Sequence, residues 1–349
     1  MANEQLIIGM PAGSLADPNR GGNMVNLLRD AGFPTKGYDK GGPTSFPLTS
    51  FIVGWDGRPQ EFGSQLAVGD IDIAIAGDDW IRERILECHY EFGQEIELTR
   101  VLSLERGSVR LVIIAPPDAG DRPWKEWFTA LLREKPLVTM VAEMPYLALE
   151  WFQAQIQELG FAESHSEFSV QKFRTPPRIE RGIVIYETWG KTEAKVTHGS
   201  VDFGLEITQS GGAIRNYGLR ILTEVLQSET GIYVSPTLRE NPVKYDLARM
   251  FLLNLYGAIY AEDKVMLLFN TKKENKGDIR EYLEKNRLFA DEPTINEGEN
   301  FTEFNVQMNA SSKELPLAKA RYELAKLGAT NIETVPLDSS IPGLHVLDF

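Results

Sequence analysis

The stretch that decides the fold runs from Val201 to Ile214 and reads VDFGLEITQSGGAI. It predicts a strand carrying the carboxylate of Glu206, then a turn of small residues, then a helix. In such a turn several backbone N–H groups can point into one concavity, which suits a phosphate. A carboxylate just upstream can accept hydrogen bonds from sugar hydroxyls, so the pattern fits a ribose 5-phosphate. A purely structural turn between strand and helix is the alternative from the same residues.

Length, charge and cysteine content limit the functions to consider. The chain has 349 residues, enough for two or three domains, and a net charge of −14 at pH 7. This acidic balance argues against nucleic acid or an anionic membrane as partner, because both attract basic surface. We see no signal peptide and no apolar run of about 18 residues. Cys88 is the single cysteine, so no intramolecular disulfide can form, and we expect a cytoplasmic protein.

Short apolar segments alternate with helical patterns over most of the chain. We expect strands at 6–10, 51–53, 71–77, 109–115, 138–141 and 182–187. This alternation predicts an α/β fold with largely parallel sheets. Two such blocks suggest two lobes with a cleft between them.

The pattern changes after residue 262. Strands at 265–269, 302–308 and 332–337 are separated by helices near 276–284 and 315–327. Two units of this kind in about 85 residues resemble a ferredoxin-like domain. From the pattern alone, a small-molecule sensor and a dimerisation domain are both open.

Several segments together resemble one enzyme family, the ATP phosphoribosyltransferases in their long form with a C-terminal regulatory domain. The resemblance covers nearly the whole chain and rests on the order and spacing of its segments. These segments are GDIDIAIAGDDW (69–80), GKTE (190–193), the stretch 201–219, LAKLGATNI (324–332) and VPL (335–337).

The resemblance implies a fold and a reaction. The fold would be two periplasmic-binding-protein-like lobes with a central cleft plus a C-terminal ferredoxin-like (ACT-like) domain. Lobe I would comprise 1–118 and 220–262, lobe II 119–219, and the regulatory domain 263–349. The reaction would move ribose 5-phosphate from phosphoribosyl pyrophosphate to N1 of ATP, the first step of histidine biosynthesis. Mg²⁺ would be held mainly by substrate phosphates, histidine would be the effector, and the chain would form a homo-oligomer, a dimer or a hexamer.

The resemblance also assigns roles to residues, none of them a nucleophile or a confident metal ligand. Glu206 matches the acid that holds the ribose hydroxyls. The loop around the 5-phosphate would comprise Thr208, Gln209, Ser210, Gly211, Gly212 and Ala213. Other substrate-binding residues would be Arg58, Glu61, Asp79, Glu193, Gly13 and Ser14. The plainer alternatives are a structural carboxylate for Glu206, a helix cap for Asp79 and a surface residue for Arg58.

The chain departs from the family pattern at three places. Ala12 and Ser14 stand where the family carries basic residues, and Ser210 and Ala213 replace two threonines of the loop. The segment EMP (143–145) replaces Ser-Tyr-Pro. These departures keep two alternatives open: a diverged transferase acting on another heterocycle, and a non-catalytic two-lobed ligand sensor.

Overall fold

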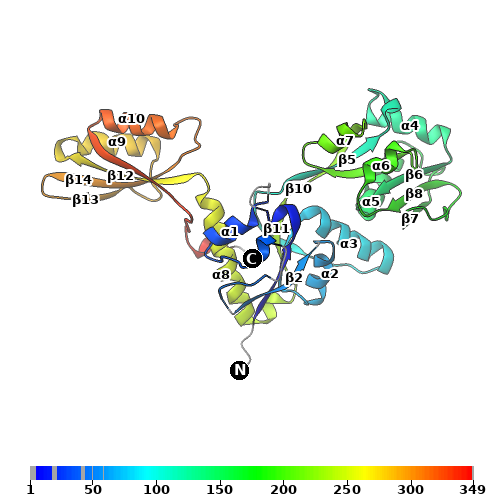
Figure 1. Cartoon of the computed structure of the whole chain (residues 1–349), viewed down its shortest axis with the longest axis horizontal. Coiled ribbons are helices and arrows are strands. Elements are labelled where there is room, and N and C mark those ends of the chain that lie inside the picture. Colours follow the sequence, from blue (N-terminus) through cyan, green and yellow to red (C-terminus); the bar gives the residue numbers. More distant parts are fainter. Residues whose placement is uncertain (1–4, 18–21, 41–43, 49, 58, 348–349) are drawn as a thin grey trace. The chain divides into compact units, whose positions relative to one another are not determined.

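The computed structural model describes residues 5–17, 22–40, 44–48, 50–57 and 59–347, apart from the side chains of Ser14 and residues 52–57. The chain divides into two compact units, of which the first comprises Met1–Val25, Thr35–Ala248 and Phe349 and the second Asn26–Pro34 and Arg249–Asp348 (Figure 1). The first unit holds two sheets and the second holds one.

The first sheet has five strands. Their order is β2 (Phe51–Gly57), β1 (Leu6–Pro11), β3 (Ile73–Gly77), β11 (Thr230–Val234) and β4 (Thr99–Ser103). One face packs on α2 (Phe62–Val68) and α3 (Asp78–Phe92), whose apolar side chains form one core with the inward residues of β3. The helix α1 (Met24–Asp30) is divided between the units: Met24 and Val25 belong to the first, and the rest of the helix belongs to the second.

The second sheet has six strands. Their order is β10 (Arg220–Ser228), β5 (Val109–Ala115), β9 (Phe203–Thr208), β6 (Leu137–Ala142), β8 (Gly182–Glu187) and β7 (Phe168–Lys172). The helices α4 (Trp124–Glu134) and α5 (Pro145–Glu158) cover one face, with an aromatic core around Trp124 and Phe152. The short helices α6 (Thr192–Thr197) and α7 (Gly212–Asn216) cover the other.

The predicted α/β fold is confirmed, but the prediction of largely parallel sheets holds only in part, because both sheets are mixed. β11 runs antiparallel to β3 and β4, and β5 runs antiparallel to both β9 and β10. The strands β10 and β11 follow one another and send the chain from one sheet back to the other. Most residues of β10 are half-buried or exposed, because this strand lies at the edge of its sheet, and so its sequence is only partly apolar. A period-2 pattern is therefore weak there.

The second unit is built on a four-stranded antiparallel sheet. Its order is β13 (Thr294–Glu297), β14 (Phe301–Asn309), β12 (Lys264–Lys272) and β15 (Ala329–Pro336). Figure 1 shows α9 (Lys276–Asn286) and α10 (Leu317–Lys326) together on one face of this sheet, over a core that includes Phe269 and Phe304. The chain order is therefore β-α-β-β-α-β, and the strands and helices expected from the sequence after residue 262 are confirmed. The helix α8 (Pro242–Ala261) leads into this unit.

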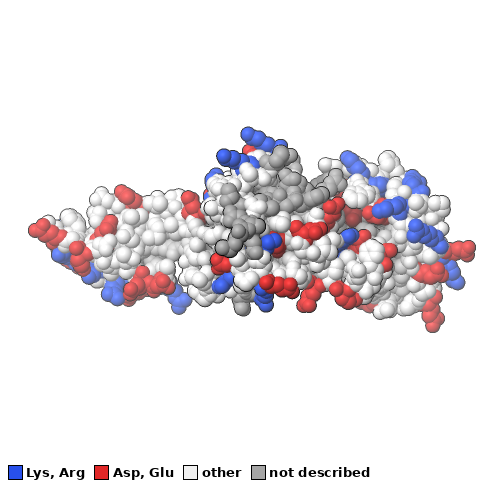
Figure 2. Space-filling model, turned by 90° about the horizontal axis from the view of Figure 1, so that it is seen from below, with Lys and Arg blue, Asp and Glu red and all other residues white. Residues whose placement is uncertain are grey.

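The surface carries both signs of charge. On the face in Figure 2, acidic and basic side chains of the described residues are interspersed. Among the helices that the structure describes, none is both long enough and apolar enough to span a membrane.

A buried carboxylate connects α3, which packs on the five-stranded sheet, with α5, which packs on the six-stranded sheet. Glu83 on α3 accepts hydrogen bonds from the backbone N–H groups of Tyr146 (3.0 Å) and Leu147 (2.8 Å). These donors lie in the first turn of α5, where no intrahelical partner exists, and Met144 supplies no side-chain cap. Burial raises the pKa of Glu83 to about 8, although the two N–H donors act in the opposite direction. Glu83 is thus the N-terminal cap of a helix on another sheet.

We predict that Glu83→Ala lowers the free energy of unfolding by about 1–3 kcal/mol, because two buried N–H groups lose their acceptor. Urea denaturation at pH 7 measures the change. Glu97→Ala, at an exposed carboxylate between α3 and β4, is the matched control and should change stability by less than about 0.5 kcal/mol. Equal stability of both variants would remove the capping role.

Candidate active site

Three neighbouring parallel strands lie in register where β6 and β8 end, and β9 continues beyond this row to Thr208. Ala142 of β6 pairs with Glu187 of β8 on one side and with Leu205 of β9 on the other. The next residue along each chain is Glu143, Thr188 and Glu206. Because neighbouring residues in a row of parallel strands share a face, these three polar side chains are brought together. Ligands of α/β sheets bind at such carboxyl ends.

The predicted phosphate loop follows β9 directly. The N–H of Gly211 donates to Thr208 Oγ1 (2.8 Å) and that of Gly212 donates to Ser210 Oγ (3.3 Å). Gly211 has φ +71°, a conformation that a residue with Cβ rarely adopts. Gln209, Ser210 and Ala213 are exposed. The loop is therefore an open, glycine-dependent turn whose amides are held by two hydroxyls that a phosphate oxygen can replace.

Arg215 adds a positive charge to this loop. Its Nη1 donates to the carbonyl oxygen of Ser210 (3.0 Å), and it lies 3.0 Å from where a Cβ on Gly211 would stand. Arg215 was not among the site residues expected from the sequence.

Glu206 carries a perturbed carboxyl group. Burial raises its pKa to about 8, and the nearby carboxylates of Glu193 and Glu143 add to the rise. Its Oε2 and the hydroxyl of Thr192 are both buried and reach no partner at full hydrogen-bond geometry, although Thr192 is near enough to oppose the rise in the pKa of Glu206. Glu206 is thus a half-buried acid on the strand that leads directly into the glycine-rich turn. Its Oε2 can accept a hydrogen bond from a ligand.

Gly204 explains how these groups come so close. A Cβ at this position would lie 2.9 Å from Thr192 Cγ2 and 3.1 Å from Val196 Cγ2. Its absence lets α6 pack directly on β9. The first turn of α6, with Thr192 and Glu193, therefore lies against the end of the strand that carries Glu206.

One ammonium group lies among these carboxylates. Lys195 on α6 donates to the carbonyl oxygen of Gly190 (2.6 Å) and to the hydroxyl of Thr188. Burial lowers the pKa of Lys195, and the charges of Glu143, Glu206 and Glu193 raise it. Lys195 was not among the site residues expected from the sequence. Its three-residue spacing from Thr192, which places both on one helix face, was the available signal.

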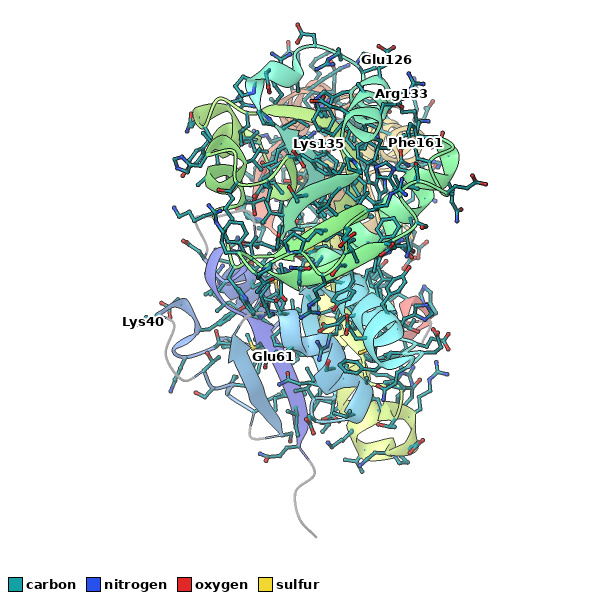
Figure 3. The ribbon with its side chains drawn as sticks, turned by 90° about the vertical axis from the view of Figure 1, so that its right-hand side faces the viewer. Lys40, Glu61, Glu126, Arg133, Lys135 and Phe161 are labelled. Atoms are coloured by element: carbon teal, nitrogen blue, oxygen red, sulfur yellow. The ribbon has the colours of Figure 1, made fainter. Side chains whose placement is uncertain are left out.

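The other predicted site residues lie on elements of the five-stranded sheet. Asp79, at the start of α3, is 3% exposed and accepts a hydrogen bond from Ser228 Oγ (2.9 Å), and burial raises its pKa. Glu61 precedes α2 and is labelled in Figure 3, and Gly13 has φ +78° with open space at its Cβ position. Among the described residues, no hydrogen bond or ion pair joins these three to the loop after β9. Arg58 and the side chain of Ser14 lie outside the described residues.

The comparisons with known proteins identify a family. The HisG family model, described as ATP phosphoribosyltransferase, matches residues 58–254, which include Glu206 and the loop. The chain belongs to the ATP phosphoribosyltransferase family. These enzymes are pentosyltransferases of the first step of histidine biosynthesis. The recognition made from the sequence is therefore confirmed.

Relatives of nearly equal length support the assignment. The chain is 25% identical over 348 residues to ATP phosphoribosyltransferase of Geotalea daltonii, covering 96% of this chain and 99% of that protein. ATP phosphoribosyltransferase 1 of Geobacter sulfurreducens gives the same identity and coverage. Among solved structures, the ATP phosphoribosyl transferase (HisG:HisZ) complex from Thermotoga maritima is 17% identical with a TM-score of 0.49, covering 72% of this chain and 97% of that one.

We predict that Glu206→Gln flattens the pH dependence of stability. A pKa raised from 4.5 to about 8 in the folded protein means that the wild type binds more protons when folded. Its stability therefore falls as pH rises between these values, by about 1.4 kcal/mol per pH unit for this group. The neutral amide removes this loss, so the variant should match the wild type near pH 4.5 and exceed it at pH 8. Urea unfolding of the wild type and the variant at several pH values in this range measures the two free energies of unfolding. If both depend on pH in the same way, the pKa of Glu206 is not perturbed.

Proposed function

We propose that this chain transfers the 5-phosphoribosyl group of phosphoribosyl pyrophosphate to N1 of ATP and releases pyrophosphate. The observation that carries the proposal is the pairing of Glu206 with the loop at 209–213, at the carboxyl ends of parallel strands in a member of this family. A transferase for another heterocycle and a non-catalytic sensor are less favoured, because the chain belongs to this family and carries both a group of carboxylates and a glycine-rich loop beside it.

In this proposal the loop holds the 5-phosphate. Phosphate oxygens accept from the N–H groups of Gly211 and Gly212, and the displaced hydroxyls of Thr208 and Ser210 turn to donate to the same anion. Arg215 supplies a charge-assisted contact. Glu206, with Glu193 beside it, accepts hydrogen bonds from the ribose hydroxyls.

The chemical step needs positioning and charge rather than a protein nucleophile. As the bond from C1 of the ribose to pyrophosphate breaks and the bond to N1 of ATP forms, positive charge develops on the sugar ring. The carboxylates of Glu143, Glu193 and Glu206 lie where their field stabilises that charge. Holding both substrates in line supplies the remaining acceleration.

Magnesium is part of the proposal through the family. Mg²⁺ prefers oxygen ligands and is commonly held by one or two carboxylates plus substrate phosphates. The unpaired Oε2 of Glu206 fits such a role, and Glu193 is the second candidate. When bound, the ion would neutralise the departing pyrophosphate. Among the described residues, no group of three or more His, Cys, Asp or Glu side chains is arranged to hold a metal ion, so the phosphates would provide most ligands.

The remaining predictions concern domains, assembly and regulation. We propose that the β-α-β-β-α-β unit is a ferredoxin-like, ACT-like domain that binds histidine, and that the chain forms a homo-oligomer, a dimer or a hexamer. We keep the three-domain division as a proposal. The boundaries between the two lobes, expected at 118/119 and 219/220, move to the two connections between the sheets, near 104–108 and at 229. This change follows β5 and β10, which pair with strands of the six-stranded sheet.

We predict that the protein forms phosphoribosyl-ATP and pyrophosphate from phosphoribosyl pyrophosphate, ATP and Mg²⁺. In Glu206→Ala, the KM for phosphoribosyl pyrophosphate should rise about 10- to 150-fold, because a hydrogen bond to a charged group contributes about 1.5–3 kcal/mol. Steady-state kinetics measure the change. Glu224→Ala, at a half-exposed acid on β10 that pairs with Arg110 (3.3 Å), is the control. A wild type without product at excess enzyme would contradict the proposed reaction, and an unaltered KM in Glu206→Ala would remove this residue from the site.

We also predict that histidine binds the full chain and inhibits it. At 100 times its dissociation constant, histidine should add about 2.7 kcal/mol to the free energy of unfolding. Thermal unfolding with histidine, and with alanine as the control ligand, measures this. No shift and no inhibition at millimolar histidine would reject histidine as effector.

A further inference from the structure

We propose that Trp189 is the stacking surface for the purine ring of the acceptor nucleotide and so determines which acceptor this enzyme prefers. This inference rests on the proposed function and names a specificity residue that neither the resemblance nor the loop pattern singles out. The juxtaposition that carries it is an exposed indole on a rigid turn beside the carboxylates at the ends of β6, β8 and β9.

Trp189 is among the more exposed large apolar side chains of the described residues. Its side chain is 68% exposed, whereas Trp124 and Trp127 of the same sheet unit are 7% and 8% exposed. Exposing a large aromatic surface to water forgoes the stabilisation that burial gives. Most of the indole surface of Trp189 is therefore open to solvent and can be covered by a ligand.

The turn that carries this indole is fixed on both sides. The N–H of Thr188 donates to the carbonyl oxygen of Ala142 (3.0 Å), and its hydroxyl donates to the carbonyl oxygen of Gly190 (3.2 Å). Lys195 donates to that same carbonyl oxygen at 2.6 Å. Gly190 has φ +77°. A backbone held this firmly presents the ring without a large loss of freedom on binding, which favours a planar ligand.

The same turn touches the carboxylate cluster. A Cβ on Gly190 would lie 3.4 Å from Glu143 Oε1, so this carboxylate lies against the residue after Trp189. Lys195 connects the turn to Glu206, because its ammonium binds Gly190 while it lies in the field of Glu206. The turn that carries the indole thus adjoins the place where the ribose would be held.

The chemistry of an indole points to the heterocycle rather than the sugar or phosphates. A base stacks on an aromatic side chain with about 1–3 kcal/mol. The acceptor of the proposed reaction must bring a ring nitrogen to C1 of the ribose, so its plane must be held beside that carbon. Trp189 can hold the plane while leaving the ring edge open to react.

The test is steady-state kinetics of the full-length enzyme with Trp189→Ala and Trp189→Phe. In Trp189→Ala, the KM for ATP should rise about 5- to 150-fold, which is the fold-change equivalent of the stacking energy, while kcat and the KM for phosphoribosyl pyrophosphate stay within twofold. Trp189→Phe should retain most of the affinity. Tyr322→Ala, at a 65% exposed aromatic on α10, is the control and should leave the KM for ATP unaltered.

A binding measurement separates this inference from the proposed reaction. Titration with ATP alone should quench the tryptophan fluorescence of the wild type and leave that of Trp189→Phe unchanged, even if no product forms. An unaltered KM for ATP in Trp189→Ala, an equal rise in both KM values, or equal quenching in Trp189→Phe would overturn the inference. A changed oligomeric state with unchanged ATP binding would instead assign Trp189 to a contact between copies of the chain.

Discussion

The site depends on one row of strand pairing. Ala142 stands between Glu187 and Leu205 in register, so the next residues, Glu143, Thr188 and Glu206, must lie side by side. A slip of one residue would turn Glu206 to the opposite face of the sheet. The register is fixed at the start of β9, where Asp202 accepts from the N–H of Thr139 (2.8 Å) and pairs with Lys135, labelled in Figure 3.

This register has an electrostatic consequence. Three carboxylates and one ammonium are confined at the edge of a sheet whose interior is apolar, so the group carries excess negative charge in a poorly solvated place. The rise in the pKa of Glu206 expresses that cost. A cationic transition state or a metal-bound substrate relieves it, whereas a neutral ligand does not. The arrangement that destabilises the free protein locally is therefore the one that favours a sugar with developing positive charge.

Much of this could be predicted from the sequence, and the failures have physical causes. Apolar strands such as Val109–Ala115 and the loop after Thr208 were readable, because burial and turn chemistry leave a local pattern. The strands β10 and β11 were not, since an edge strand and a short central one depend on partners far away in the sequence. The contacts of Lys195 and the fixed turn around Trp189 depend on how α6 packs over Gly204, which spacing along the chain does not encode. Asp79 was identified by its position after a strand, but the structure gives its carboxylate an internal partner in Ser228.

The central claim is that Glu206 and the loop at 209–213 grip an activated pentose phosphate. A crystal structure of the full chain soaked with phosphoribosyl pyrophosphate and Mg²⁺ tests it most directly. The account predicts the 5-phosphate within hydrogen-bond distance of the amides of Gly211 and Gly212, and a ribose hydroxyl donating to Glu206. Density for the ligand elsewhere, with Thr208 and Ser210 still bonded to those amides, would contradict it.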